Sequence, residues 1–186
     1  MMKSMFGYAA GLLLTASVAA AAPAGQVERK DFQVAKDIAS SVQRYAQFTI
    51  FDDVSAYVKD GAVTLTGKVT MPYKRDDIEK RIAKVNGVRR VTDQITVLPV
   101  SQFDDELRYR IARSIYNNSN FWSYATMVNP PIHIVVEHGR VTLTGVVQSE
   151  VDRMLARTLA TQFGALSVTN ALKTDAEVSD ALAKSH

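Results

Sequence analysis

Few side chains in this sequence have the types and spacing that catalysis requires. The histidines are His133, which alternation places on the outward side of a strand, His138 in a turn, and His186 at the chain end. This spacing predicts neither a Ser-His-Asp arrangement nor a metal cluster. We therefore expect no catalytic residue, no metal ion and no cofactor, and the sequence indicates a protein that is not an enzyme.

The acidic and sulfur-containing residues lead to the same expectation. Adjacent carboxylates lack the spacing of a calcium-binding loop, so we interpret them as loop and helix-start charges. These pairs are Asp52-Asp53, Asp76-Asp77 and Asp104-Asp105. The chain has no cysteine, which excludes disulfides, thiol catalysis and thiolate metal sites.

One short phrase occurs twice, as GAVTLTG at residues 61–67 and as GRVTLTG at residues 139–145. Threonine alternates with valine and leucine, which is typical of a strand with one half-exposed face and one buried face. Gly67 and Gly145 lie on the buried side, so we expect a helix or a neighbouring backbone to pack closely there, or the strand to bulge. A phosphate loop would need a helix directly after the strand. The phrase is therefore interpreted as scaffold. Its outward hydroxyls are those of Thr64, Thr66, Thr142 and Thr144, and its structural glycines are Gly61, Gly67, Gly139 and Gly145.

The same order of patterns surrounds each copy of the phrase. A helical apolar period precedes it, an alternating hairpin turns at Asp60-Gly61 or His138-Gly139, and a second helical period and a last strand follow. Each unit is thus helix, strand, strand, helix, strand. The predicted fold class is α+β, with two tandem αββαβ two-layer sandwiches, each a three-stranded mixed sheet with two helices on one face.

Several residues mark where these helices begin and end. Asp31 and Asp104 are predicted as N-cap or first-turn carboxylates. Gly87 and Gly164 are predicted to stop the second helix of each unit. The last strands are expected in VRRVTDQITVL (88–98) and LSVTNALKT (166–174).

The N-terminus resembles an export signal. Lys3 precedes an apolar run, Phe6 to Val18, that is too short to span a bilayer comfortably, and small residues follow it. We expect residues 1–22 to be a signal peptide and the protein to be periplasmic, although an uncleaved anchor is an alternative. Removing Lys3 lowers the formal net charge from +3 to +2, too little for the dense basic face of a nucleic-acid-binding domain.

The residues from Gly139 to Leu172, GRVTLTGVVQSEVDRMLARTLATQFGALSVTNAL, resemble the BON domain. The first copy resembles it too, with Asp93 in place of the last Asn. The resemblance is to dual-BON periplasmic proteins of the osmotically inducible (OsmY-like) kind. It implies a non-catalytic envelope protein linked to envelope stress and membrane integrity, and in some members binding of anionic phospholipid. The expected segments are 30–99 for the first domain, 103–175 for the second and 176–186 for a C-terminal tail.

Two segments are candidates for lipid binding. Residues 74–90 form a basic amphipathic helix, which suits either anionic headgroups or an ordinary solvated helix face. Residues 116–131 hold the only tryptophan and several other aromatics, which suit either a membrane interface or the end of a small core. The candidate residues are Arg108, Arg110, Arg113, Tyr116, Phe121, Trp122, Tyr124, Lys80, Arg81 and Lys84.

We therefore expect a partner that is either anionic phospholipid or an outer-membrane or envelope protein, and no nucleic acid. Lipid binding through one BON domain is the leading hypothesis. The alternative is a soluble periplasmic stress protein with chaperone-like activity or with docking through a sheet edge such as residues 91–97. The sequence leaves the oligomeric state open.

Overall fold

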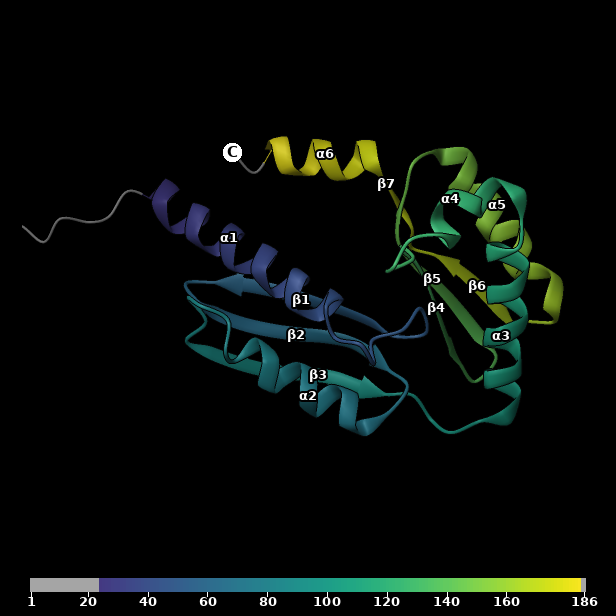
Figure 1. Ribbon diagram of the computed structural model, residues 1–186, viewed down its shortest axis with the longest axis horizontal. Coiled ribbons are helices and arrows are strands. Elements are labelled where there is room, and N and C mark those ends of the chain that lie inside the picture. The colour runs from purple at the N-terminus through teal and green to yellow at the C-terminus, as the bar shows by residue number, and fades with distance from the viewer. Residues whose placement is uncertain (1–23, 185–186) are drawn as a thin grey trace, which may run out of the picture.

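The structure is a computed structural model that describes residues 24–184, so the predicted signal peptide lies outside the described residues. Figure 1 shows two α+β units that follow one another along the chain. The first unit contains α1 (Ala24–Gln43), β1 (Asp53–Lys59), β2 (Ala62–Val69), α2 (Pro72–Ile82) and β3 (Arg90–Val97). The second contains α3 (Gln102–Tyr116), η1 (Ser119–Phe121), α4 (Trp122–Ala125), β4 (Ile132–Glu137), β5 (Arg140–Val147), α5 (Glu150–Ala160), η2 (Thr161–Phe163), β6 (Ser167–Asn170), β7 (Lys173–Thr174) and α6 (Asp175–Lys184).

Both units have the predicted αββαβ topology. In the first, β2 lies in the middle, antiparallel to β1 and parallel to β3. The crossover helix α2 allows this parallel pair, because a tight turn can join only antiparallel strands. The second unit repeats the order β4-β5-β6, but its last strand is split, and β7 also pairs with β5. The prediction of the fold class is confirmed.

The two hairpin turns have the conformation that their dipeptides favour. Asp60 and Gly61 have φ of 51° and 74°, and His138 and Gly139 have φ of 51° and 73°. Two consecutive positive φ angles define the turn that matches the twist of antiparallel strands.

Aspartates on the preceding helices hold these turns in place. The Asp31 carboxylate accepts the N–H groups of Asp60 (2.7 Å) and Gly61 (3.1 Å), and Asp104 accepts those of His138 and Gly139 (2.8 Å each). The prediction of a helix start was wrong for Asp31, because α1 begins at Ala24. Asp104 does lie in the first turn of α3. The N-caps of α3 and α5 are Ser101 and Ser149.

The predicted close approach at the repeated glycine is confirmed. A Cβ on Gly67 would overlap the carbonyl oxygen of Asp53, and one on Gly145 would overlap that of Pro131. In both copies the neighbouring backbone lies at the start of the hairpin's first strand, at the first residue of β1 and at the residue just before β4. Both glycines also have positive φ, so any side chain would be strained there.

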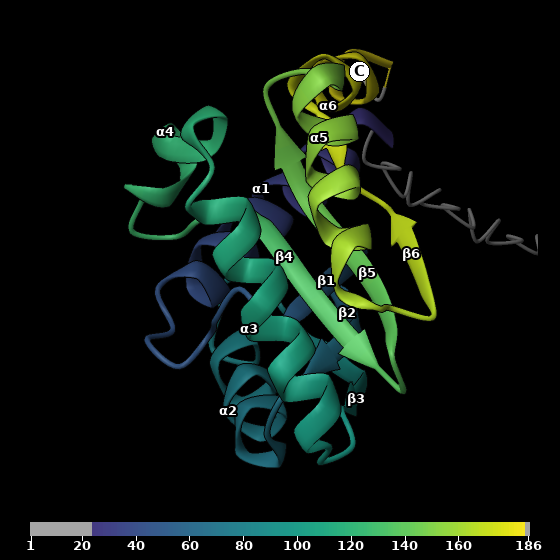
Figure 2. The same ribbon diagram turned by 90° about the vertical axis from the view of Figure 1, so that its right-hand side faces the viewer.

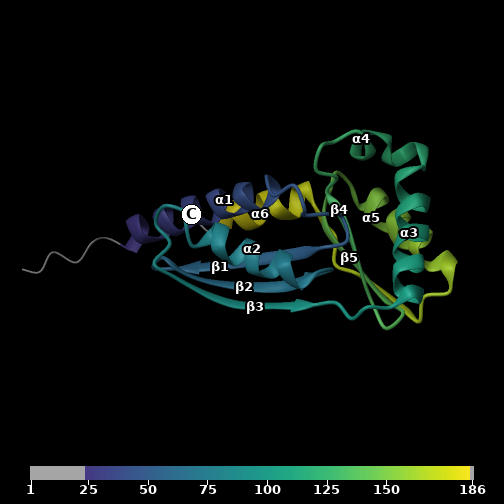
Figure 3. The same cartoon turned by 60° about the horizontal axis from the view of Figure 1, so that its bottom comes forward.

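Each unit has its own hydrophobic core between its sheet and its helices. Leu65 and Ile78 are fully buried in the first core, and Leu143 and Ile111 in the second. In Figures 1 and 3, α3 and α5 cover the side of the second sheet that faces away from the first unit, while α6 extends back toward α1.

The units meet through residues 46–52, here called the junction loop. Its Ile50 carbonyl accepts the N–H of Ile134 on β4 at 2.7 Å. Ile50 and Phe51 pack against the second core, and the ring of Phe51 meets Tyr109 edge-on at 5.2 Å. One segment of the first unit is therefore bound to the edge strand of the second.

Candidate functional site

A buried ion pair fixes the junction loop. The Asp52 side chain is fully buried, that of Lys74 nearly so, and Lys74 Nζ donates to Asp52 Oδ2 at 2.7 Å. The same carboxylate accepts the N–H and the hydroxyl of Thr49 and of Thr70 at 2.7–2.9 Å. Asp52 thus ties the start of α2 to the loop that carries Ile50.

These contacts set the charge state of Asp52. Burial would raise its pKa, but the hydrogen bonds from Lys74, Thr70 and Thr49 outweigh burial and hold the pKa below its usual value. The sequence analysis interpreted Asp52 as a loop charge. It missed this role because the residues around Asp52 do not indicate that Lys74, 22 residues further along the chain, forms an ion pair with it. The network is structural: five donors bind the Asp52 carboxylate and fix the junction loop.

In the second unit a tyrosine hydroxyl takes the place of the Asp52 carboxylate. The Tyr124 hydroxyl accepts the N–H of Gln148 at 2.7 Å and lies 3.0 Å from Asp152 Oδ2. Burial and Asp152 raise the pKa of Tyr124 even though the Gln148 N–H opposes them. Tyr124 therefore anchors α4 to the start of α5, and both hydrogen bonds of its hydroxyl are made within the second unit.

Four of the candidate lipid-binding residues pack into the second unit, and Tyr116 is partly buried while the other three are buried. Arg108 is buried, pairs with Asp105 and donates to the Val136 carbonyl at 2.7 Å. The Tyr116 hydroxyl bonds to both the carbonyl and the N–H of Ile132, and burial raises its pKa. Phe121 and Tyr124 are buried as well. Arg108, Phe121 and Tyr124 therefore do not form part of an exposed surface, and the Tyr116 hydroxyl is bound to the backbone of β4.

The remaining candidates of the second unit are exposed residues of α3 and α4, helices that Figure 2 shows from the helical side of the second sheet. Trp122 on α4 is 71% exposed. Arg110 and Arg113 on α3 are exposed and line a shallow hollow with Ser114, Asn117 and Phe163. Arg110 pairs with Glu106.

Helix α5 adds to this side a feature that the sequence reading missed. Val151 and Met154 are 72% and 62% exposed. Arg157, one turn further, is exposed too. Neither Arg113 nor Arg157 forms an ion pair within residues 24–184. We call Arg110, Arg113, Trp122, Val151, Met154 and Arg157 the helical face.

The candidates of the first unit lie at the C-terminal end of α2 and in the turn that follows it. Lys80, Arg81 and Lys84 are exposed and line a second shallow hollow with Ser41 and Asp77. Arg81 lies over the ring of Tyr45 at 4.7 Å, and the Tyr45 hydroxyl donates to Asp77 at 2.7 Å. Burial and Asp77 together raise the pKa of Tyr45 to about 12.

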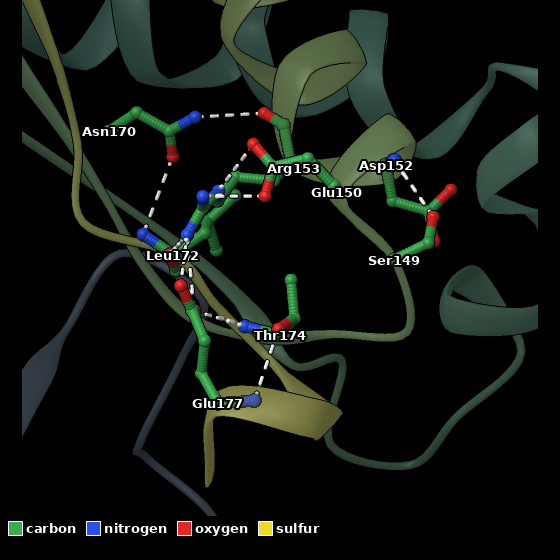
Figure 4. Close-up of polar contacts among 8 residues, drawn as sticks. All are labelled: Ser149, Glu150, Asp152, Arg153, Asn170, Leu172, Thr174 and Glu177. Carbon is green, nitrogen blue, oxygen red and sulfur yellow. Dashed lines mark hydrogen bonds and ion pairs between the residues drawn. The ribbon is translucent and has the colours of Figure 1, made fainter. Parts of the chain in front are cut away.

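A polar cluster joins α6 to the second unit (Figure 4). Arg153 on α5 bonds to Glu150 and to Glu177 of α6, and Glu177 also accepts the N–H of Thr174 at 2.9 Å. The Asn170 amide donates to the Arg153 carbonyl at 2.8 Å. The segment expected as a tail thus begins as an anchored helix.

The geometry of the two units agrees with the comparison with protein families. The family model of the BON domain matches residues 30–99 and again residues 104–176. The chain belongs to the BON-domain family. BON domains are in general non-catalytic, and the family is known for phospholipid binding and stress roles.

Comparison with other proteins adds little to this assignment. The chain is similar at 12% identity to CdsD, a structural protein of the type III secretion system of Chlamydia trachomatis, over 81% of this chain and 97% of that one, with a TM-score of 0.30. The C-terminal domain of CdsD is also 12% identical, over 75% of this chain and 96% of that one, with a TM-score of 0.26. No curated protein matches the chain significantly.

Among residues 24–184, no helix combines the length and the apolar character needed to cross a bilayer.

Proposed function

We propose that this dual-BON protein is a non-catalytic protein of the bacterial envelope that binds anionic phospholipid surfaces through the helical face of its second domain, in the manner of osmotically inducible, OsmY-like proteins. The observation that carries the proposal is the composition of that face. It combines exposed arginines with an exposed tryptophan and two exposed aliphatic side chains on three neighbouring elements.

Each component matches a layer of a membrane surface. Arginine near an anionic surface contributes about 1 kcal/mol per residue. Tryptophan favours the interface between headgroups and acyl chains. Val151 and Met154 are apolar side chains that a soluble helix would normally turn toward its core, and contact with lipid would remove their surface from water.

Flotation with liposomes tests the proposal. The chain from residue 24 onward is expected to float with vesicles that contain phosphatidylglycerol and to float poorly with pure phosphatidylcholine. Rising salt is expected to release it, because screening weakens the attraction between the arginines and the anionic headgroups. The triple variant Arg113→Ala, Arg157→Ala, Trp122→Ala is expected to lose most of this binding at an unchanged melting temperature.

A matched variant in the first domain separates the two candidate surfaces. Lys80→Ala with Lys84→Ala removes charge from the end of α2 and the turn that follows it, and leaves the helical face intact. Unchanged flotation of that variant supports the second domain as the binding domain. Binding that is lost in the α2 variant and kept in the triple variant would move the function to the first domain.

A further inference from the structure

The two sheets have four outer edges, and the edge of β4 is blocked. On β4, Tyr116 occupies the N–H and carbonyl of Ile132, Ile50 takes the N–H of Ile134, and Arg108 binds the carbonyl of Val136. A blocked edge cannot accept another strand.

In the last strand of the first unit and just after β6 in the second, a side chain accepts one backbone N–H two residues further along. Asp93 Oδ1 on β3 accepts the N–H of Ile95 at 2.8 Å. Asn170 Oδ1 on β6 accepts the N–H of Leu172 at 3.3 Å. The edge at residues 91–97, which the sequence suggested for docking, is therefore partly closed.

The edge of β1 contacts β4 of the second unit but has none of these hydrogen bonds. Val54, Ala56 and Val58 occupy the positions of Ile132, Ile134 and Val136, since both hairpins have the same register relative to the repeated phrase. Within residues 24–184, only β2 forms backbone hydrogen bonds with β1. The outward N–H and carbonyl groups of these three residues have no protein partner there.

The β1 edge lacks these hydrogen bonds because α1 differs from α3 at two corresponding positions. Asp31 and Asp104 make the same contacts with their turns, so Ala35 of α1 corresponds to Arg108 of α3 and Gln43 to Tyr116. Ala35 is too short to reach a strand edge, and no hydrogen bond to β1 is formed by Gln43.

Burial confirms that the edge is open. Val54, Ala56 and Val58 are only half-buried, whereas Ile132, Ile134 and Val136 are completely buried. At the two ends of β1, Asp53 and Lys59 form no ion pair with any residue of the described chain.

We propose that the edge of β1 binds an extended polypeptide segment of a partner protein, which adds an antiparallel fourth strand to the first sheet. The unpaired backbone groups would provide the hydrogen bonds, as in other cases of strand addition. This surface lies in the first domain and is independent of the lipid-binding face.

The charges at the ends of β1 define the partner's chemistry. An antiparallel strand places a residue of the partner directly opposite Asp53 and another, six residues away, opposite Lys59. A Lys or Arg fits the first position and an Asp or Glu the second. Between them, small apolar side chains at alternate positions would face α1 and continue the row of Val54, Ala56 and Val58.

A single strand fits this edge better than a second copy of the chain. Helix α1 runs along β1 on the helical side of the sheet (Figures 1 and 2). Antiparallel pairing of two β1 edges would bring both helical layers to the same face, so that the two α1 helices would compete for the same space.

The strand's own sequence provides the probe. The peptide DVSAYVK, paired antiparallel with residues 53–59, places its Lys opposite Asp53 and its Asp opposite Lys59. A fluorescent form is titrated with the chain from residue 24 onward and followed by anisotropy. The control peptide has the same side chains but is N-methylated at its two Val residues and its Ala, which removes the N–H groups that would face β1.

Two variants close the edge without touching the core. Ala35→Arg with Gln43→Tyr reproduces the protection found on β4, and Ala56→Pro removes an N–H that points away from β2, which an edge strand tolerates. Saturable binding of DVSAYVK that weakens at least tenfold in both variants, and is absent for the methylated peptide, is the expected result. Melting temperatures verify that both variants fold.

Three results of the peptide titrations would overturn the proposal. They are no saturable binding to the unaltered chain, equal binding of the methylated peptide, and unchanged affinity in both folded variants. A concentration-dependent dimer in sedimentation that Ala56→Pro abolishes would identify a second copy as the occupant and reject the partner segment.

Discussion

At the scale of residues, the most consequential contact is the buried pair Asp52–Lys74. Its geometry is good, and two threonines satisfy the remaining lone pairs of the carboxylate. Such a pair gives little net stability relative to apolar residues of the same shape, but breaking it leaves an uncompensated charge in the interior. The pair therefore contributes mainly to the position of the junction loop.

Asp52→Asn is expected to lower the free energy of unfolding of the first domain by about 3–5 kcal/mol, because the Lys74 ammonium remains buried without a counter-charge. Urea titration measures the loss. Asp52→Asn combined with Lys74→Met is expected to be less damaging than Asp52→Asn alone. A double variant that loses the sum of the two single effects would show that the residues are not coupled.

The same carboxylate predicts an acid dependence. The pKa of Asp52 is lower in the folded than in the unfolded chain, where it is about 3.9. Its stabilising contribution is therefore complete above about pH 4 and is lost as the pH falls through the folded pKa. Urea midpoints at pH 7 and pH 3 are expected to differ less in Asp52→Asn than in the unaltered protein.

At the scale of elements, each hairpin depends on one glycine whose missing Cβ lets the two strands approach. Gly145→Ala is expected to cost several kcal/mol, because the new Cβ would overlap the Pro131 carbonyl and the φ of Gly145 is 113°. Gly164→Ala is the matched control. Its φ is 77°, but no atom lies within 4 Å of the added Cβ, so about 1 kcal/mol is expected.

Thermal unfolding of the two variants separates steric overlap from backbone strain. Similar losses in both would show that positive φ alone, and not the approach of the opposite strand, explains the repeated glycine.

At the scale of the whole molecule, the two domains are held together by a small interface around Ile50 and Phe51. The Lys68–Glu137 ion pair across it is partly exposed and contributes little. Interfaces of this kind permit domain motion. Ile50→Asp places a charge against the second core, so we expect the domains to separate while each stays folded.

Small-angle X-ray scattering measures this separation as a larger radius of gyration, and circular dichroism checks that secondary structure is kept. Val100→Asp, at a fully exposed linker position, is the control and is expected to leave the radius unchanged. An unchanged radius in Ile50→Asp would show that other contacts hold the domains together.

Local sequence patterns predicted much of the fold, but they did not predict which candidate residues are exposed. Alternation around Asp60-Gly61 and His138-Gly139 predicted the hairpins because strand period and turn chemistry are local properties. Tyr116 and Arg108 were candidates for lipid binding because their polar ends suit a membrane interface. Both bind the backbone of β4, Tyr116 at a residue 16 positions further along the chain and Arg108 at one 28 positions further.

The sequence by itself determined the duplicated αββαβ unit, the turn conformations and the role of the repeated glycine, because hydrophobic period and backbone sterics act over a few residues. Tertiary structure alone decided which polar side chains are exposed and which sheet edges are open. Those properties depend on groups that meet only after folding, such as Asp52 with Lys74 and Arg108 with the Val136 carbonyl.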